Sequence, residues 1–184
     1  MTEISLNVLD IAQNSIKAKA TLIEISVLID TKADRMTIII KDNGCGMSEE
    51  QVEKVIDPFF TTRTTRKVGL GVSFFKMAAE MTGGSFSITS RQGEGTTDIA
   101  EFVISSIDRM PLGDICGTIE TLIVYNTDID FLYKYKVDDE EFELSTAEMR
   151  EMLDGIPLDT PEVKAYIREY LSENTKTANK DFIF

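Results

Sequence analysis

Apolar residues recur at helical or strand spacing through the first 104 residues of the chain. Spacing of three and four residues is typical of an amphipathic helix, and short β-branched runs between polar turns are typical of strands. Ser48 with Gln51 forms a capping box, and Gly83 with Gly84 is a helix-stop signal. The predicted elements are a helix over 4–18, strands over 22–29 and 36–41, a helix from 48 to about 56, a helix over 70–81, and strands over 85–90 and 96–104. This order predicts an open sheet with helices on one face.

The pattern becomes acidic after residue 108. Short apolar runs predict strands over 118–125, 131–137 and 142–144. Capping signals at Ser145 and Thr160 predict two closing helices, and we expect residues from about 173 onward to be loose. The predicted organisation is therefore one domain over residues 1–106 and an acidic C-terminal extension over residues 107–184.

Composition excludes several classes of protein. No apolar run approaches the roughly 20 residues of a membrane span, and residues 1–9 do not form a secretory signal, so we expect a cytoplasmic protein. The chain has no histidine. This excludes a Ser/His/Asp triad, a Cys/His dyad, a zinc-protease motif and a phosphoacceptor histidine within it. Cys45 and Cys116 are expected to be free thiols.

The net charge of −13 is unevenly distributed. Residues 107–184 carry 18 acids and 8 bases, whereas residues 1–106 carry 14 acids and 11 bases. An acidic surface repels a phosphate backbone, so nucleic acid is not an expected partner. A membrane is not expected either, because no apolar run is long enough to span one. The excess acid either is a solvated face or binds a basic surface of a protein partner.

Polar residues form a stripe along the first predicted helix. Asn7, Asp10, Asn14 and Lys17 fall within roughly 80° of arc at helical spacing. The stripe is either an ordinary solvated face or a site for a hydrated cation and phosphate. Magnesium usually takes few protein oxygens and keeps several waters, so one amide such as Asn14 is a sensible ligand.

Two glycine-containing segments are candidates for a nucleotide site. Asp42 precedes Gly44 and Gly46 at the end of a predicted strand, where a carboxylate can accept from an amine on a flat base. The alternative is a plain turn of the Asn-Gly type. Later, Gly69, Leu70 and Gly71 begin a predicted helix whose free amides suit a phosphate.

Taken together, these segments resemble the GHKL superfamily of ATP-binding domains over about residues 4–106. The front half is most similar to MutL, whereas Asp57 to Arg63 resembles the phenylalanine box and lid of histidine kinases. The resemblance implies the Bergerat fold, an α+β two-layer sandwich whose open mixed sheet is covered on one face by about three helices. It also implies ATP and Mg²⁺ as ligands.

The resemblance assigns roles residue by residue. Asn14 would hold Mg²⁺, Asp42 would read adenine, and Asp10 stands where the family's ATPases and serine kinases carry a catalytic Glu. The remaining implied nucleotide-binding residues are Lys17, Gly44, Gly46, Met47, Phe59, Arg63, Gly69, Leu70, Gly71, Val72 and Thr97.

The expected function is that of an Mg-ATP-binding regulatory protein that transfers the γ-phosphate to a partner protein or hydrolyses ATP slowly. Asp10 would orient the acceptor hydroxyl or water. The alternative is a non-catalytic ATP sensor whose nucleotide state switches a protein interaction. A third hypothesis is a MutL-like clamp acting on DNA, which the acidic charge argues against.

Overall fold

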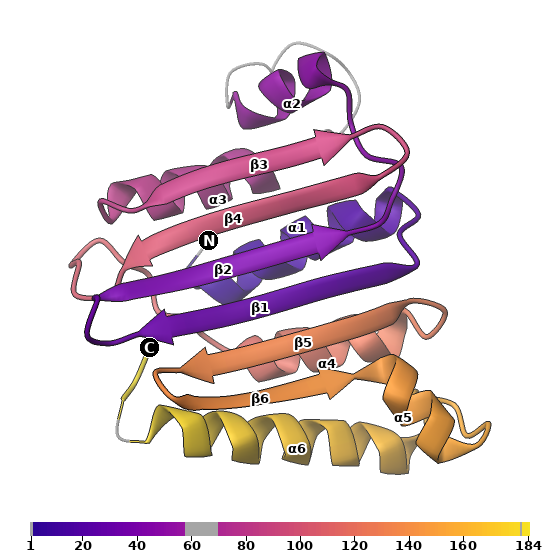
Figure 1. The fold of residues 1–184 in the computed structure, drawn as a ribbon. Coiled ribbons are helices and arrows are strands. Elements are labelled where there is room, and N and C mark those ends of the chain that lie inside the picture. Colours follow the sequence, from indigo (N-terminus) through magenta and orange to yellow (C-terminus); the bar gives the residue numbers. More distant parts are fainter. Residues whose placement is uncertain (1, 58–69, 181) are drawn as a thin grey trace.

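A single sheet organises the protein. The computed structural model describes residues 2–57, 70–180 and 182–184, and these form a six-stranded sheet of order β3-β4-β2-β1-β5-β6 (Figure 1). All neighbouring strands are antiparallel except β1 and β5, which are parallel. The strands are β1 (Leu22–Asp30), β2 (Arg35–Asp42), β3 (Ser85–Arg91), β4 (Gly95–Val103), β5 (Asp130–Val137) and β6 (Glu140–Ser145).

The helices cover one face of this sheet. Helices α1, α3 and α4 lie behind it, α6 runs along the edge next to β6, and α2 lies beyond β3 (Figure 1). The helices are α1 (Ile4–Lys17), α2 (Glu49–Ile56), α3 (Gly71–Met81), α4 (Ile115–Tyr125), α5 (Thr146–Leu153) and α6 (Pro161–Asn179). No helix in the described part of the chain is long and apolar enough to cross a membrane.

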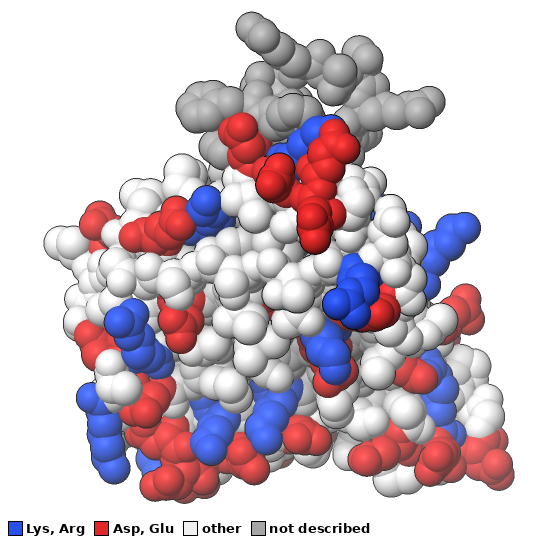
Figure 2. Space-filling view, turned by 45° about the horizontal axis from the view of Figure 1, so that its top comes forward, with Lys and Arg blue, Asp and Glu red and all other residues white. Residues whose placement is uncertain are grey.

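Alternation along the strands explains why the sheet has one covered face. In β1, Ile23, Ile25, Val27 and Ile29 are buried, whereas the residues between them are at least partly exposed. Successive strand side chains point to opposite faces, so these four meet the helices and their neighbours face solvent. The middle of the open face is mostly uncharged, with charged groups of both signs at its margins (Figure 2).

The predicted fold class is confirmed. The structure has the expected α+β architecture, with a mixed sheet and helices packed on one face. Each element expected within the first 106 residues is present, with ends shifted by only one or two residues. The capping box at the start of α2 is also confirmed, because the side chains of Ser48 and Gln51 each bond to the other's backbone amide.

The extension continues the sheet. Strand β5 pairs with β1 along its length, with Ile25 opposite Tyr133 and Val27 opposite Tyr135. Both tyrosine rings are fully buried and join the same hydrophobic core as β1. The residues after 107 therefore complete a hydrogen-bonding edge of β1 that would otherwise be unpaired.

Two expectations for the extension are wrong. The predicted strand over 118–125 is helix α4, whose Ile119, Leu122 and Ile123 are buried at helical spacing. A short apolar run does not by itself distinguish a strand from a helix, and Asp114 supports the helix as its N-cap by accepting from the Gly117 amide. The tail expected to be loose from residue 173 is helical to Asn179, which accepts a hydrogen bond from Tyr135.

The segment before α4 holds the start of α1. Glu3 makes no side-chain cap, and the amides of Ile4 and Ser5 donate instead to the carbonyls of Pro111 and Leu112 at 3.0 and 2.9 Å. The Leu112 amide in turn donates to the carbonyl of Phe184. First-turn amides of a helix have no partner within the helix, so this contact satisfies two of them.

The docking of α6 can be tested by a cavity-forming substitution. Leu171 is fully buried on α6, and Leu171→Ala should lower the free energy of unfolding by about 2–5 kcal/mol. Urea unfolding with the exposed Ser172→Ala as control would measure it. Equal stability of the two variants would contradict the packing of α6.

Candidate functional site

A cavity of about 300 Å³ lies where the turn after β2 meets the helices. Helix α1, helix α2, the start of α3 and strands β3 and β4 all contribute lining residues. Apolar side chains including Ile11, Met47, Val55, Val72 and Ile88 form much of its wall. Polar groups enter it at Asn14, Asp42, Thr96 and Asp98. An apolar cavity with a few convergent polar groups is the usual form of a small-molecule site.

Asp42 is the most firmly positioned polar group in this cavity. It ends β2 and is only 8% exposed. The hydroxyl of Ser15 donates to its Oδ2 at 2.6 Å, and the amide of Gly44 donates to its Oδ1 at 2.8 Å. Each carboxylate oxygen accepts one such bond and can accept another. The protein therefore fixes the Asp42 carboxylate while leaving acceptor capacity for a ligand.

The glycine turn is shaped by close backbone contacts. Gly46 has φ +62°, and a Cβ there would lie 2.0 Å from the Arg91 carbonyl oxygen. Gly95 has φ +119°, and its Cβ would lie 1.9 Å from the Asp42 carbonyl oxygen. Only glycine fits at either position. The side chain of Asn43 accepts from the amides of Thr21 and Leu22 and so connects the turn to the start of β1.

A second acid, Asp98, was missed by the sequence analysis. It lies on the helix-facing side of β4, is 4% exposed, and its Oδ1 has no hydrogen-bond partner among the described residues. Burial, with a smaller contribution from the negative charge of Asp42, raises its pKa from 3.8 to about 7. The available signal was strand alternation, since Asp98 shares a face with Ala100 and Phe102.

The same alternation places Thr96 and Thr97 on opposite faces of β4. Thr97 pairs with Lys41 and lines an adjoining hollow of about 600 Å³, which shares Asp42, Met47 and Thr96 with the cavity. Thr96, one residue earlier, lines the cavity beside Asp42. A shift of one residue along a strand moves a side chain to the other face.

The four polar residues of the predicted stripe on α1 lie in different surroundings. Asn14 lines the cavity, whereas Lys17 is exposed and is not part of its lining. Asn7 is 1% exposed, and neither atom of its amide has a partner among the described residues. Asp10 is only partly exposed and lies against the start of α3. The stripe is therefore not a simple solvated face.

The start of α3 lies close to Asp10. A Cβ at Gly71 would lie 3.0 Å from the Cβ of Asp10 and 3.6 Å from its Oδ2. Val72 lines the cavity, and Leu70 is 42% exposed. Gly71 therefore allows the carboxylate of Asp10 to approach the positive end of the helix. Three predicted site residues, Phe59, Arg63 and Gly69, lie outside the described residues.

The donor set for a metal is sparse. In the described part of the chain, no group of three or more His, Cys, Asp or Glu side chains could hold a metal ion. The Asn14 amide fits a different kind of magnesium site, in which one protein oxygen joins substrate phosphates and several waters. The residues present are compatible with Mg²⁺ carried in by a phosphate ligand.

The raised pKa of Asp98 predicts a pH-dependent stability. Its folded pKa of about 7 exceeds the ordinary value of 3.8, so the folded protein retains a proton that the unfolded chain releases. Its contribution to stability is most favourable below about pH 4 and is lost as the pH rises to 7, by as much as about 4 kcal/mol. Asp98→Asn should remove this decline.

Urea unfolding at pH 5 and pH 8 measures this effect. Asp98→Asn should gain stability relative to the unmodified protein at pH 8 and much less at pH 5. The exposed Asp108→Asn serves as a control. If both variants behave alike at both pH values, Asp98 is not the titrating group.

A family model matches the part of the chain that builds this cavity. The family model described as "Histidine kinase-, DNA gyrase B-, and HSP90-like ATPase" matches residues 2–107. The "Putative sensor histidine kinase NtrY-like" of Rickettsia conorii is 29% identical over 108 residues, which are 59% of this chain and 18% of that protein. The "Putative sensor protein" of Shewanella frigidimarina is 34% identical over 102 residues, 54% of this chain and 16% of that protein. The chain thus spans less than a fifth of either relative.

A solved structure shares the fold. The N-terminal domain of a DNA repair protein superposes with a TM-score of 0.53 at 18% sequence identity, over 79% of this chain and 52% of that chain. The family model covers more than half of the 184 residues. The chain therefore belongs to the histidine kinase-, DNA gyrase B- and HSP90-like ATPase family.

Proposed function

We propose that this protein binds Mg-ATP in the cavity beside Asp42 and acts as a regulatory protein that transfers the γ-phosphate to a partner protein or hydrolyses ATP slowly. The observation that carries the proposal is the buried carboxylate of Asp42, held by Ser15 and the Gly44 amide with acceptor capacity to spare. A carboxylate in this state accepts from the exocyclic amine of adenine. Guanine presents a carbonyl at that position, so the acceptor capacity that Asp42 leaves for a ligand would receive no donor.

The cavity wall suits a flat base. Met47, Val72 and Ile88 supply apolar contacts, and Gly46 lets the backbone approach the ring. Asp98, uncharged below about pH 7, would offer a proton donor to a ring nitrogen. Thr96 replaces Thr97 in our assignment, because Thr96 lines the cavity.

The phosphates would lie toward the junction of α1 and α3. Asn14 would supply an amide oxygen to Mg²⁺, which neutralises charge developing on the transferred phosphoryl group. Lys17 and the amides at the start of α3, including those of Leu70 and Gly71, would add positive potential. Phe59, Arg63 and Gly69 remain predicted nucleotide-binding residues.

Asp10 is our candidate for the residue that orients the acceptor. Its carboxylate lies beside Gly71, where the γ-phosphate would meet the helix start. A base there would take the proton of a water or a partner's hydroxyl. The non-catalytic sensor is kept as the alternative because Asp10 does not line the cavity and has one methylene fewer than the Glu found in the family's ATPases.

We expect the partner to approach the extension. Residues 107–184 carry 18 acids against 8 bases, and an excess of one sign favours a partner surface of the other. The partner would therefore be a protein with a basic surface.

The adenine assignment is tested by Asp42→Asn. The substitution removes the negative charge and one acceptor, so ATP affinity should fall by about 10- to 100-fold. Isothermal titration calorimetry measures the affinity for ATP and for GTP. Asp108→Asn is the control, and circular dichroism verifies that each variant is folded. Unchanged preference for ATP over GTP in Asp42→Asn would show that another group reads the base.

The catalytic assignment is tested by Asp10→Asn, which keeps the size of the side chain next to Gly71. If Asp10 is the base, turnover should fall by about 100-fold or more while ATP affinity changes by less than about twofold. Release of labelled phosphate and labelling of a partner in a cell extract are the measurements. No activity in the unmodified protein would support the sensor alternative, whereas equal activity in both proteins would show that Asp10 is not the base.

A further inference from the structure

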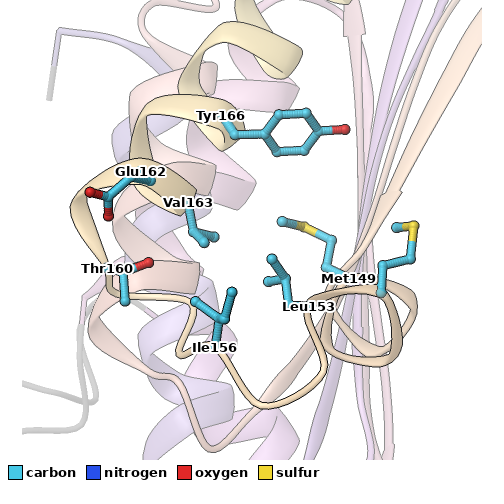
Figure 3. A pocket seen from close by; sticks show the side chains of 8 residues that line it. Met149, Leu153, Ile156, Thr160, Glu162, Val163 and Tyr166 are labelled. Carbon is cyan, nitrogen blue, oxygen red and sulfur yellow. The ribbon is translucent and has the colours of Figure 1, made fainter.

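An apolar groove lies in the extension, formed by residues that the nucleotide cavity does not use. It has a volume of about 490 Å³ and lies between α5 and α6. Met149, Leu153, Ile156, Val163 and Tyr166 converge on it from α5, the connecting loop and α6 (Figure 3). We refer to this set, together with Met152, as the α5–α6 groove.

The groove is open to solvent. Its floor is buried, with Met149 and Val163 each 6% exposed. Its rim is not, because Met152, Ile156 and Tyr166 are 74%, 52% and 53% exposed. Large apolar side chains gathered around one open groove are typical of an interaction site. A small molecule would be poorly enclosed by such a rim, whereas a polypeptide segment would cover it.

The charge around the groove is strongly negative. Residues 146–163 contain five acidic residues and a single basic one, Arg150. The guanidinium of Arg150 is held inward by Asp130 and by the carbonyls of Thr127 and Ile129. Acidic groups gather at the lower right corner of Figure 2, the corner at which α5 lies in Figure 1. The rim therefore attracts cations and repels anionic lipids and nucleic acids.

We propose that the α5–α6 groove binds a cationic amphipathic helix of a partner protein. Apolar side chains on one face of that helix would enter the groove, and its Lys and Arg residues would lie near Glu148, Glu151 and Glu162. An amphipathic helix in an apolar groove is a recurrent mode of recognition. The flexible side chains of Met149 and Met152 suit such a surface because they adapt to the shape of a ligand.

This inference rests on the proposal that the extension binds a protein partner, and it is independent of nucleotide binding. The α5–α6 groove is then the place in the extension at which the partner protein binds. The excess of acid alone would bind any basic segment weakly, whereas the groove selects one whose apolar residues recur at helical spacing.

Three synthetic peptides and the 184-residue chain provide the test. The first is a Leu/Lys peptide of about 18 residues with leucines on one helical face. The second has the same composition with the leucines dispersed around the helix, and the third has Glu in place of Lys. Fluorescence anisotropy measures the affinity of each peptide for the unmodified protein and for Met152→Gln, Ile156→Gln and Met81→Gln. Met81 is a matched control, since it is 58% exposed on α3, away from the groove.

The first peptide should bind at least about tenfold more tightly than either of the others, a difference of about 1.4 kcal/mol. Met152→Gln and Ile156→Gln should weaken its binding by about tenfold, and Met81→Gln by less than about twofold. Equal binding of the first two peptides, or equal binding by all variants, would overturn the groove as the site. Self-association abolished by Ile156→Gln would instead identify a second copy of this chain as the occupant.

The same variants separate this result from the proposed function. Ile156→Gln should bind ATP with unchanged affinity, because the groove and the nucleotide cavity share no residue. Loss of peptide binding with retained ATP binding assigns the effect to the groove. Loss of both in Ile156→Gln would contradict the independence of the two sites.

Discussion

The structure depends on strand β1, which must satisfy its backbone groups on both edges. Its side chains bury one face of the sheet, β2 pairs with one edge, and β5 pairs with the other. Buried backbone amides and carbonyls without partners are costly, so neither neighbour is optional. The family segment supplies β2 and the extension supplies β5. Both parts of the chain therefore build one hydrophobic core around β1.

The candidate site combines this rigid support with buried charge. Asp42 ends the strand next to β1, and Ser15 of α1 holds its carboxylate from the helix layer. Asp98 enters the same cavity from β4, and its Oδ1 has no hydrogen-bond partner in the described part of the chain. Burial raises the pKa of Asp98 to about 7, and repulsion by the charge of Asp42 adds to this effect. A ligand that offers both a donor and an acceptor would satisfy the pair.

The sequence predicted the features that depend on local chemistry. The glycine turn at Asp42, the capping box at Ser48 and the amphipathic spacing of α1 each carry their own signal. Features that depend on tertiary context were missed. The run at 118–125 is apolar and β-branched whether it forms a strand or a helix, and packing decides between them. The choice between Thr96 and Thr97 needs the register of β4 to within one residue. The burial of Asp98 follows from the same register. Residues after 173 are mostly polar, so the sequence does not indicate that Ala178 is buried.

The hydrogen bonds from Ile4 and Ser5 to the segment before α4 have a consequence for dissecting the protein. A fragment cut at residue 107, where the family match ends, would lose the acceptors of two α1 amides as well as the partner of β1. Fraying would begin one turn from Asn7 and spread toward Asp10 and Asn14, which are on the same helix. Biochemical work on the isolated family segment would therefore understate the affinity of the cavity for the nucleotide that we propose it binds, even though every residue lining that cavity would still be present.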